Sequence, residues 1–336
     1  MKLPKVSIVV LSFNGEKYLK RCLLSVEKQI YPKNKLELIV VDNGSSDKSV
    51  KLAKKYTNRV YVIKNIDGGY SNRASGMRLA TGDFVYMILE QDMELRSKYF
   101  LQKLVRPLIE DPRIVASFTR EYPNNKQPWI NRFVSSNPSQ SAPLFEYLTP
   151  SVSSTIIERR VNYSICKYIP GKIPTTTHML FRVSTLKKTS IWRQKRDFDH
   201  DTIIKLVKAR YQKFAYVPDA GIYHYHVNSL KELIDKSLRN LENHYFPYNH
   251  SLSYRWTDFS SKREVIKLVV WVIYANLFFP ALVRGIVRFL KYHDYILLAE
   301  PVVVIVTTDA ILIKFLTNKV GRKLAIQALK TIIKGR

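Results

Sequence analysis

Short apolar runs of strand length recur through the first part of the chain, and segments of helical length separate them. The runs are rich in β-branched residues and apolar at consecutive positions, which predicts strands buried on both faces. They lie at Val6–Leu11, Leu36–Val41, Val60–Ile63 and Phe84–Leu89. The segments predicted as helices are Gly15–Gln29, Ser46–Tyr56 and Ser71–Leu79. This alternation predicts an α/β fold with a mostly parallel central sheet covered by helices.

The rhythm is lost between residues 119 and 175, where Pro, Asn, Ser and Gln accumulate. We expect long loops there. Order returns with an apolar run at Met179–Phe181, a helical pattern at Asp201–Tyr211 and a strand pattern at Lys213–Val217. The α/β pattern is therefore expected to extend to about residue 230.

The composition changes again after Phe259. Leu268–Val283 is a run of 16 residues without a charge, interrupted by Pro280, and Tyr295–Leu316 is apolar but carries two acids and a lysine. A helix that spans a membrane needs about 20 apolar residues. Neither segment is a clean span, so we expect a hydrophobic helical appendage.

Charge changes the interpretation of this appendage. Lysine and arginine total 55 against 27 acidic residues, a net charge of +28, and from Lys262 onward there are 13 basic residues against 4 acids. Apolar stretches punctuated by cations are typical of helices lying in a bilayer interface with anionic head groups. The alternative is a helical packing or dimerisation element, which would make the chain a homodimer through its C-terminal helices. We favour association with anionic membrane lipids.

Cysteine content and the N-terminus bear on location. The two cysteines, Cys22 and Cys166, make no disulfide framework, which suits a reducing compartment. The first residues run directly into a strand pattern without the apolar region of a signal peptide. We therefore expect the protein at the cytoplasmic face of the cell membrane, either peripheral or monotopic, or with short inserted helices.

Polar motifs follow the first two predicted strands. The first strand ends in Ser12, Phe13 and Asn14, and the second in Asp42 and Asn43. In a parallel α/β sheet, ligands bind beyond the carboxyl ends of the strands. An acid at such a position accepts a hydrogen bond from a base or a ribose hydroxyl. A plain turn followed by a helix cap is the alternative for the Asp-Asn-Gly-Ser-Ser-Asp sequence.

The fourth predicted strand ends in a cluster of acids, Glu90, Asp92 and Glu94, with Gln91 between them. Clustered carboxylates repel one another unless a cation lies among them, and oxygen ligands suit Mg²⁺ or Mn²⁺ shared with a substrate diphosphate. Such a cation neutralises charge on a departing nucleotide diphosphate. A solvated acidic loop is the alternative.

The ordered motifs SIVVLSFNG, LELIVVDNGSSD, GGYSNRASGMRLATGDF and MILEQDMEL resemble the family 2 glycosyltransferases of GT-A fold. Members with one dominant aspartate in the acidic motif, such as rhamnosyltransferase-like enzymes, are the most similar in pattern. The resemblance covers about residues 5 to 230. It implies an inverting transferase that takes a hexosyl or deoxyhexosyl group from a nucleotide diphosphate sugar, with UDP-, dTDP- and GDP-sugars all suitable.

The resemblance also implies roles for particular residues. Asp42 would contact the nucleotide base, Arg73 would reach the diphosphate and Asp92 would hold the metal. The full set implied for donor binding is Ser12, Phe13, Asn14, Asp42, Asn43, Arg73, Glu90 and Gln91. Two positions depart from the family pattern, because Glu90 replaces the usual leading aspartate and Ala74 replaces an asparagine. Metal dependence is therefore less firmly implied than nucleotide-sugar binding.

The catalytic base is expected after residue 195. Asp199 falls where the family carries the aspartate of its Glu-Asp pair, and Phe198 replaces the glutamate. An inverting transfer needs a base beside the acceptor hydroxyl. Asp199 is our candidate, with Asp197 in reserve, whereas capping of the next helix is the alternative and the expected role of Asp201.

Histidines complete the implied site. His224 matches the position of a histidine that often completes the metal or diphosphate site, with a packed polar residue as the alternative. His178 and Arg182 lie where family members face the acceptor.

The resulting organisation is a GT-A domain over residues 1–230 and a membrane-associating helical region over residues 231–336. Within the first, residues 1–118 form the nucleotide-sugar-binding half and residues 119–230 the acceptor half. The acceptor is expected to be a lipid-linked molecule or a glycan. A catalytically degenerate nucleotide-sugar-binding scaffold is the alternative. Nucleic acid is not expected as a partner, because the basic residues are spread along the chain and match no recognised module.

Overall fold

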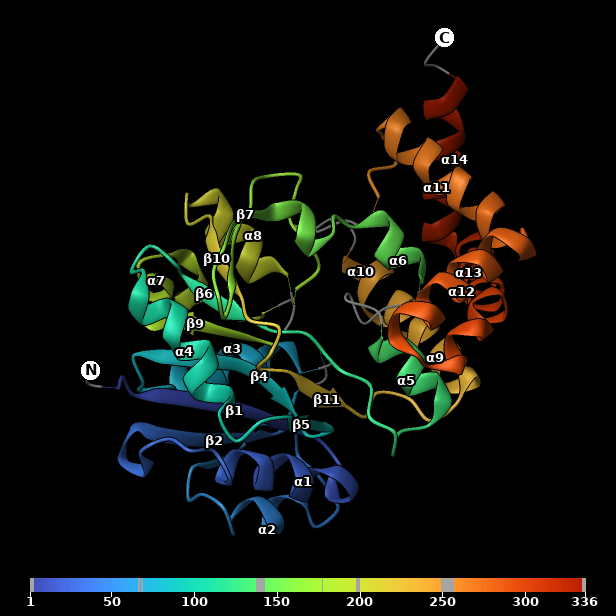
Figure 1. Cartoon of the computed structure of the whole chain (residues 1–336). Coiled ribbons are helices and arrows are strands. Elements are labelled where there is room, and N and C mark those ends of the chain that lie inside the picture. The colour runs from blue at the N-terminus through green and yellow to red at the C-terminus, as the bar shows by residue number, and fades with distance from the viewer. Residues whose placement is uncertain are drawn as a thin grey trace. The chain divides into compact units, whose positions relative to one another are not determined.

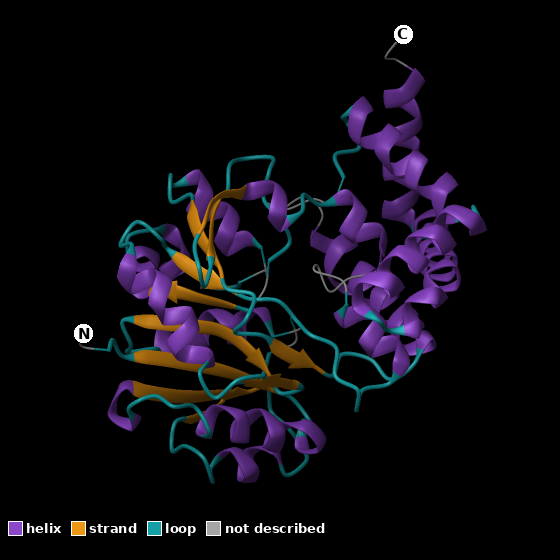
Figure 2. Cartoon of the chain, in the orientation of Figure 1, coloured by secondary structure: helices purple, strands orange, loops and turns teal. Residues whose placement is uncertain are grey.

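The computed structural model describes residues 3–65, 67, 69–136, 143–176, 178–197, 200–248 and 257–333. Its contacts divide the chain into two compact units. The first contains Met1–Tyr122 and Ser151–Tyr225, and the second contains Pro123–Pro150 and His226–Arg336. Strands flanked by helices make up the first unit, and the second is built of helices (Figure 2). Residues 123–150, which the sequence analysis placed in the first domain, thus pack with the C-terminal helices.

A nine-stranded sheet organises the first unit, in the order β3-β2-β1-β4-β9-β6-β10-β8-β7 (Figure 1). The strands β3, β2, β1 and β4 are mutually parallel, and β6 and β10 form a second parallel pair. Antiparallel β9 joins these two sets, and β8 and β7 continue antiparallel beyond β10. The bounds are β1 (Val6–Ser12), β2 (Leu36–Asp42), β3 (Val60–Val62), β4 (Phe84–Glu90), β6 (Ala116–Phe118), β7 (Ile156–Arg159), β8 (Ser164–Lys167), β9 (Met179–Arg182) and β10 (Lys213–Tyr216).

Helices bury both faces of the parallel strands. Ile8 and Val10 of β1 belong to a core shared with α1 (Glu16–Glu27), α2 (Ser49–Ala53) and α4 (Phe100–Glu110). On the opposite face α3 (Tyr70–Leu79) approaches so closely that a Cβ atom on Gly76 would lie 2.4 Å from Val9 Cγ1. The four predicted strands and the three predicted helices are confirmed, although α1 and α2 are shorter than expected.

The prediction of long loops between residues 119 and 175 is wrong in part. The structure has α5 (Trp129–Ser135), α6 (Pro143–Leu148), β7 and β8 there. These elements are four to seven residues long, too short for a helical or strand period to emerge from the sequence. In α5, Ile130, Phe133 and Val134 are buried at the spacing of one helical face.

The later predictions for the first unit are confirmed. Strand β9 coincides with the apolar run that begins at Met179, α8 (Asp201–Lys208) comes after the acidic segment, and β10 comes next. A separate two-stranded sheet pairs β5 (Met93–Leu95) with β11 (Ile222–His224) in antiparallel register. Glu121 forms an isolated parallel bridge to Ile222. This small sheet therefore brings three segments that are distant in sequence to the carboxyl end of β4.

The second unit consists of helices packed around aromatic and aliphatic side chains, among them Trp271, Val304 and Ile311. The predicted helical, apolar C-terminal region is confirmed. Besides α5 and α6 its helices are α9 (Leu230–Asn240), a π-helical turn (Leu241–Tyr245), α10 (Phe246–Tyr248), α11 (Lys262–Ala275), α12 (Phe278–Tyr292), the 3-10 turn η5 (Tyr295–Ala299), α13 (Glu300–Thr317) and α14 (Lys319–Ile333).

The uncharged run at residues 268–283 is broken into two helices. The axes of α11 and α12 are bent by 86°. Pro280 lies in the first turn of α12, and its missing N–H cannot bond to the carbonyl of Asn276, so a continuous helix is interrupted there. Among the described residues, one helical segment, Tyr295–Thr317, is long and apolar enough to cross a membrane, with a mean hydropathy of 2.2 and half of it buried. A buried core helix has the same composition.

Candidate functional site

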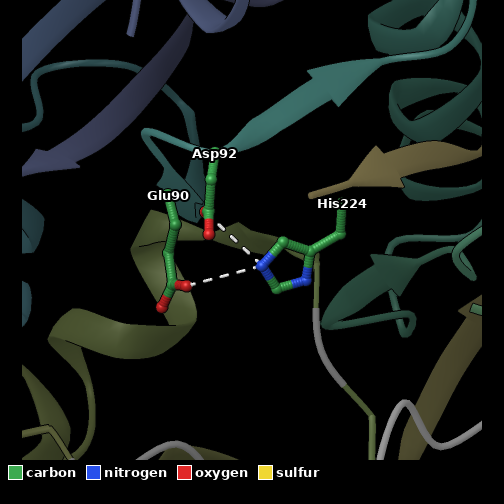
Figure 3. Close-up of side chains that lie close together, drawn as sticks. All are labelled: Glu90, Asp92 and His224. Atoms are coloured by element: carbon green, nitrogen blue, oxygen red, sulfur yellow. Dashed lines mark ion pairs between the residues drawn. The ribbon is translucent and has the colours of Figure 1, made fainter. Parts of the chain in front are cut away.

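Two carboxylates and an imidazole converge at the carboxyl end of β4. Nε2 of His224 lies 3.4 Å from Asp92 Oδ1 and 3.9 Å from Glu90 Oε2. One ligand atom from each of the three residues falls within 4.8 Å of the others. Figure 3 shows both carboxylates directed at the same nitrogen of the His224 ring. Asp92 and His224, predicted from distant motifs, are thus brought together, and Glu90 joins them.

The small sheet explains this convergence. His224 is the register partner of Met93, the residue that follows Asp92. The backbone N–H of Tyr225 also donates to the carbonyl of Asp92 at 2.9 Å. The turn before β11 contains Gly221 at φ +67°, a conformation that suits glycine, and a Cβ atom there would lie 2.9 Å from the Arg96 side chain. Backbone pairing therefore sets the distance between the acidic motif and the histidine.

Glu121 lies behind the cluster and was not predicted. Its carboxylate is 1% exposed, and Oε1 lies 2.6 Å from His224 Nδ1 and 3.2 Å from His178 Nε2. Glu121 follows the carboxyl end of β6 by three positions, much as Asp92 follows β4. The strand-end rule could have found it, but the short β6 run in the sequence was not identified as a strand.

The histidines keep this buried carboxylate ionised. Burial alone would raise the pKa of Glu121, but the charge of His224 and the hydrogen bonds from both histidines lower it well below its usual range. Burial would likewise lower the pKa of His224, whereas the charges of Glu121 and Asp92 raise it well above the ordinary value.

The donor set suits a divalent cation. Carboxylates of Glu90 and Asp92 supply hard oxygen ligands, and the Nε2 atom of His224 supplies one nitrogen. Glu121 accepts at the other ring nitrogen of His224, which is the usual outer-sphere partner of a metal-bound histidine. The nitrogen favours Mn²⁺ over Mg²⁺, because Mg²⁺ prefers oxygen ligands alone.

The loops after β1 and β2 form one hydrogen-bonded unit. The backbone N–H of Asn14 donates to Ser45 Oγ at 2.8 Å, and Asn14 Oδ1 accepts from the backbone N–H of Ser46 at 2.9 Å. Asn14 has a φ of +47°, which asparagine tolerates better than most residues. Beside it the Phe13 side chain is 52% exposed, and Ser12 Oγ is buried with no hydrogen-bond partner in the described part of the chain.

Asp42 and Asn43 hold these loops in shape. Asp42 Oδ1 accepts from the backbone N–H groups of Gly44 and Ser45, and Oδ2 accepts from Ser45 Oγ at 2.6 Å. The side-chain amide of Asn43 makes a reciprocal pair with the backbone of Asn65. The turn-forming role considered for Asp42 is therefore present in the structure.

Gln91 connects the acidic motif to the first loop. Its side-chain amide accepts from the backbone N–H of Phe13 at 2.8 Å and donates to the Phe13 carbonyl at 3.0 Å. The contact needs a glycine nearby, since a Cβ atom on Gly15 would lie 1.9 Å from Gln91 Oε1. Gln91 thus fixes the position of Phe13 relative to the acidic cluster.

Arg73 extends the cluster toward α8. Its guanidinium donates to Glu90 Oε1 at 2.9 Å, and the side chain is 13% exposed. The positive charge of Arg73 also acts on two buried groups: it offsets part of the rise in the pKa of Asp197, and with burial it lowers the pKa of His200 to about 4. Arg73 therefore lies between the acidic cluster and the segment that precedes α8.

Asp197 is 1% exposed, and burial raises the pKa of its carboxyl, opposed by hydrogen bonds from Thr202 and Gln194 and by the charge of Arg73. Oδ1 accepts from Thr202 Oγ1 at 2.7 Å, which ties the segment to the first turn of α8. Asp199 and Phe198 lie outside the described residues. His178 and Arg182, the two candidates for facing the acceptor, have different surroundings. His178 contacts Glu121, whereas Arg182 donates to the backbone carbonyls of Leu108 and Ile114.

Residues 7–186 match the family model described as "Glycosyl transferase family 2", more than half of the chain. The chain belongs to glycosyl transferase family 2. The protein is therefore a glycosyltransferase, and its first unit has the GT-A fold, as the resemblance implied.

Curated relatives match part of this family 2 glycosyltransferase. A poly(ribitol-phosphate) β-N-acetylglucosaminyltransferase, TarS of Staphylococcus aureus, is 32% identical over 93 residues, which cover 26% of this chain and 16% of that protein. Glycosyltransferase AglE of Haloferax volcanii is 32% identical over 85 residues, 24% of this chain and 28% of that protein. The matches thus span less than a third of either relative.

Solved structures resemble it over nearly its full length. A mannosyltransferase, PcManGT of Pyrobaculum calidifontis in complex with GDP-Man and Mn²⁺, has 14% identity and a TM-score of 0.48, covering 100% of this chain and 89% of that one. Residues 1–349 of S. aureus TarS in complex with UDP have 15% identity and a TM-score of 0.47, covering 99% and 92%.

Proposed function

We propose that this family 2 glycosyltransferase inverts the anomeric centre of a nucleotide diphosphate sugar as it transfers the sugar to a lipid-linked or glycan acceptor at the cytoplasmic face of the membrane. The observation that carries the proposal is the convergence of Glu90, Asp92 and His224 at the carboxyl end of β4. A parallel α/β sheet binds its ligands at this edge.

A divalent cation fits this convergence. Glu90, Asp92 and His224 would hold it, and Mn²⁺ suits the mixed oxygen and nitrogen set better than Mg²⁺. When bound, such a cation would neutralise the charge that develops on the departing nucleotide diphosphate.

Different side chains around the cluster would bind different parts of the donor. The exposed Phe13 ring and the buried Ser12 hydroxyl lie on the loop that would receive the nucleotide base. Asp42, Asn43 and the amide of Gln91 keep this loop in shape. The Arg73 guanidinium, adjacent to Glu90, would bind the diphosphate, because it is a planar donor suited to phosphate oxygens.

Asp199 is our candidate for the base that deprotonates the acceptor hydroxyl, with Asp197 in reserve. The contacts of Asp197 with Thr202 and Gln194 support a local structural role, which favours Asp199. If the acceptor is a sugar hydroxyl, Asp199→Asn should abolish transfer. If it is a lipid phosphate, which needs no base, the same variant should remain active.

The surface of the second unit supports membrane association. Apolar side chains are exposed along three of its helices, and examples are Val270, Ile273, Phe279, Val283, Val287, Leu290, Leu329 and Ile333, each at least 50% exposed. Exposed cations accompany them at Lys262, Arg263, Lys291, Lys319, Arg322, Lys323 and Lys330. Apolar area next to cations matches the chemistry of an anionic lipid surface.

The polar side chains of α13 argue for a helix within the unit rather than a lone membrane span. Glu300 is fully buried and pairs with Arg284 at 2.7 Å and with Arg288. Thr308 Oγ1 accepts from Trp271 Nε1 at 3.1 Å. These contacts join α13 to α11 and α12.

Further along α13, Asp309 Oδ1 accepts from Asn276 Nδ2 at 3.2 Å, and Lys314 pairs with Glu242. Each of these charged groups on α13 thus has a partner on another helix of the same unit. We infer that the unit is monotopic, with α13 held against α11 and α12 by these contacts and the exposed apolar faces of α11, α12 and α14 in the lipid interface.

The reaction is tested by nucleotide-sugar hydrolysis and transfer with the wild type, Asp92→Ala and Asp199→Ala. We expect metal-dependent turnover that falls in Asp92→Ala, with Glu158→Gln on the exposed strand β7 as the control. Residual turnover unchanged in both variants would remove the catalytic assignment and favour a degenerate scaffold.

A further inference from the structure

A buried glutamate, Glu121, lies beside the small sheet and contacts two histidines. Glu121 and His178 are 2% exposed or less at their side chains, and neither belongs to the group that would bind the cation. Burial of a carboxylate is costly unless hydrogen bonds compensate it. The hydrogen bonds with His224 and His178 offset this cost, so these contacts explain why a glutamate is buried there.

We propose that Glu121 is a positioning residue that orients His224 for the divalent cation, and that His178 holds Glu121 in place. The proposal rests on the cation site of the proposed function. It concerns a residue that touches neither cation nor donor, and it predicts a specific defect in cation affinity.

The hydrogen bond between Glu121 and His224 determines which ring nitrogen faces the cation site. Oε1 of Glu121 lies 2.6 Å from Nδ1 of His224, and a carboxylate oxygen that faces a ring nitrogen accepts a hydrogen bond from it, which assigns the hydrogen to Nδ1. The neutral ring then has its lone pair on Nε2, the atom that faces Asp92 at 3.4 Å. Without Glu121 the ring could rotate or adopt the other tautomer, and Nε2 would no longer be a reliable ligand.

Backbone pairing holds the glutamate beside the histidine. Glu121 bridges to Ile222, two residues before His224, and the backbone N–H of Tyr122 donates to the Ile222 carbonyl at 2.9 Å. The same short strand pairs with the segment that follows Asp92. His224 and Glu121 are therefore held in place by the same small group of paired segments.

His178 supports the glutamate from the other side. Its Nε2 atom lies 3.2 Å from the same oxygen that accepts from His224. His178 has a φ of +56°, a conformation that is unfavourable for a non-glycine residue and persists only where the surroundings fix it. The strain is consistent with a ring held in place for this contact.

The test is direct titration with Mn²⁺ alone, without nucleotide, in which electron paramagnetic resonance measures the free and bound Mn²⁺. We expect Glu121→Gln to weaken Mn²⁺ binding about 10- to 100-fold, the effect typical of losing such a support. His178→Gln should weaken it less, because His224 keeps its direct bond to Glu121. The matched control is Glu110→Gln at the end of α4, whose carboxylate accepts from Tyr163 and not from a histidine; its Mn²⁺ affinity should equal that of the wild type.

A second readout separates positioning from general damage to the fold. Long-range ¹H–¹⁵N spectra of the His224 ring with Zn²⁺ as a diamagnetic cation that accepts imidazole should show hydrogen on Nδ1 in the wild type and a mixture in Glu121→Gln. Equal Mn²⁺ affinity in the wild type and Glu121→Gln would overturn the positioning role. No Mn²⁺ binding by the wild type itself would instead refute the cation site, and the proposal with it.

Should Glu121→Gln not fold, His178→Gln decides the question. This variant leaves the buried carboxylate and its bond to His224 intact while removing one support. A Mn²⁺ affinity and His224 spectrum identical to those of the wild type would contradict the role of His178, and a loss of affinity with the Nδ1 hydrogen retained would contradict an effect through the tautomer.

Discussion

Buried charges occur in both units, but they are arranged differently. In the helical unit Glu300 lies between two arginines, so each charge there is satisfied by a neighbour. At the end of β4 the carboxylates of Glu90 and Asp92 are both directed at one imidazole nitrogen, and Glu90 pairs with Arg73 as well. The first arrangement suits packing, and the second suits a ligand. The geometry of a charged cluster therefore says more about function than the number of charges in it.

The largest effect on stability is expected from Glu300→Ala. Removing the glutamate leaves the buried Arg288 and the partly exposed Arg284 without their carboxylate, which costs about 3–5 kcal/mol of folding free energy. Denaturant unfolding followed through Trp271 and the other helical-unit chromophores measures this. Mn²⁺ affinity of the remaining folded protein should not change. A loss below ~1 kcal/mol would contradict the structural role assigned to the pair.

The largest effect on activity is expected from Asp92→Ala. Losing the cation at the departing diphosphate should lower transfer about 10²- to 10³-fold, the size of effect seen when charge stabilisation is removed from a transition state. Stability should be equal or higher, because repulsion from Glu90 is relieved. Steady-state transfer at saturating Mn²⁺ together with thermal unfolding gives both quantities. A variant that is as active as the wild type but less stable would reverse the contrast between the two units.

A smaller effect is expected at the surface of the helical unit. Arg322→Gln with Lys323→Gln should weaken binding to vesicles containing anionic lipid by ~1 kcal/mol per residue, or about 5-fold each. Lys54→Gln with Lys55→Gln, exposed cations at the end of α2, is the matched control and should leave binding unchanged. Vesicle flotation measures the affinity.

Two results of the flotation experiment would contradict the membrane proposal. Equal losses in both double variants would indicate a nonspecific effect of net charge. Failure of the wild type to float, together with a stable dimer in solution, would assign the exposed apolar faces to a second copy of the chain.

The smallest effect is expected from Gln91→Ala. The two hydrogen bonds to the Phe13 backbone are partly exposed and contribute about 1 kcal/mol to the order of the loop. We expect a rise in the KM for the donor of up to ~10-fold with kcat little changed, measured with the donor as the varied substrate. A fall in kcat with unchanged KM would place Gln91 in the chemical step instead.

The parallel half of the fold was predictable because its strands are long and buried on both faces. Val6–Ser12 and Phe84–Glu90 are apolar at consecutive positions, a pattern that only a covered sheet satisfies. The three-residue strands β5, β6 and β11 have no such signature, since their pairing depends on contacts far away in sequence. The helices α5 and α6 are too short for a helical period to emerge from the sequence, which therefore predicted loops there.

The candidate site was predictable to the same extent as the strands that carry it. Asp92 and His224 were selected from their motifs, and the structure brings their side chains together. Glu121 was missed because the three-residue strand β6 before it was not identified in the sequence, so the strand-end rule was not applied there. For Asp42 the sequence allowed two interpretations, a contact with the nucleotide base or a role in the turn. The structure shows the hydrogen bonds of the turn.

The central claim is that Glu90, Asp92 and His224 make a cation-dependent site for a nucleotide diphosphate sugar. A thermal-shift screen of UDP-, GDP- and dTDP-sugars with and without Mn²⁺, on the wild type and Asp92→Ala, tests it most directly. Ligand at a hundred times its dissociation constant stabilises the folded protein by ~2.7 kcal/mol. We predict a shift with one nucleotide class that requires Mn²⁺ and disappears in Asp92→Ala. A folded wild-type protein that responds to no donor, with or without Mn²⁺, would contradict the account.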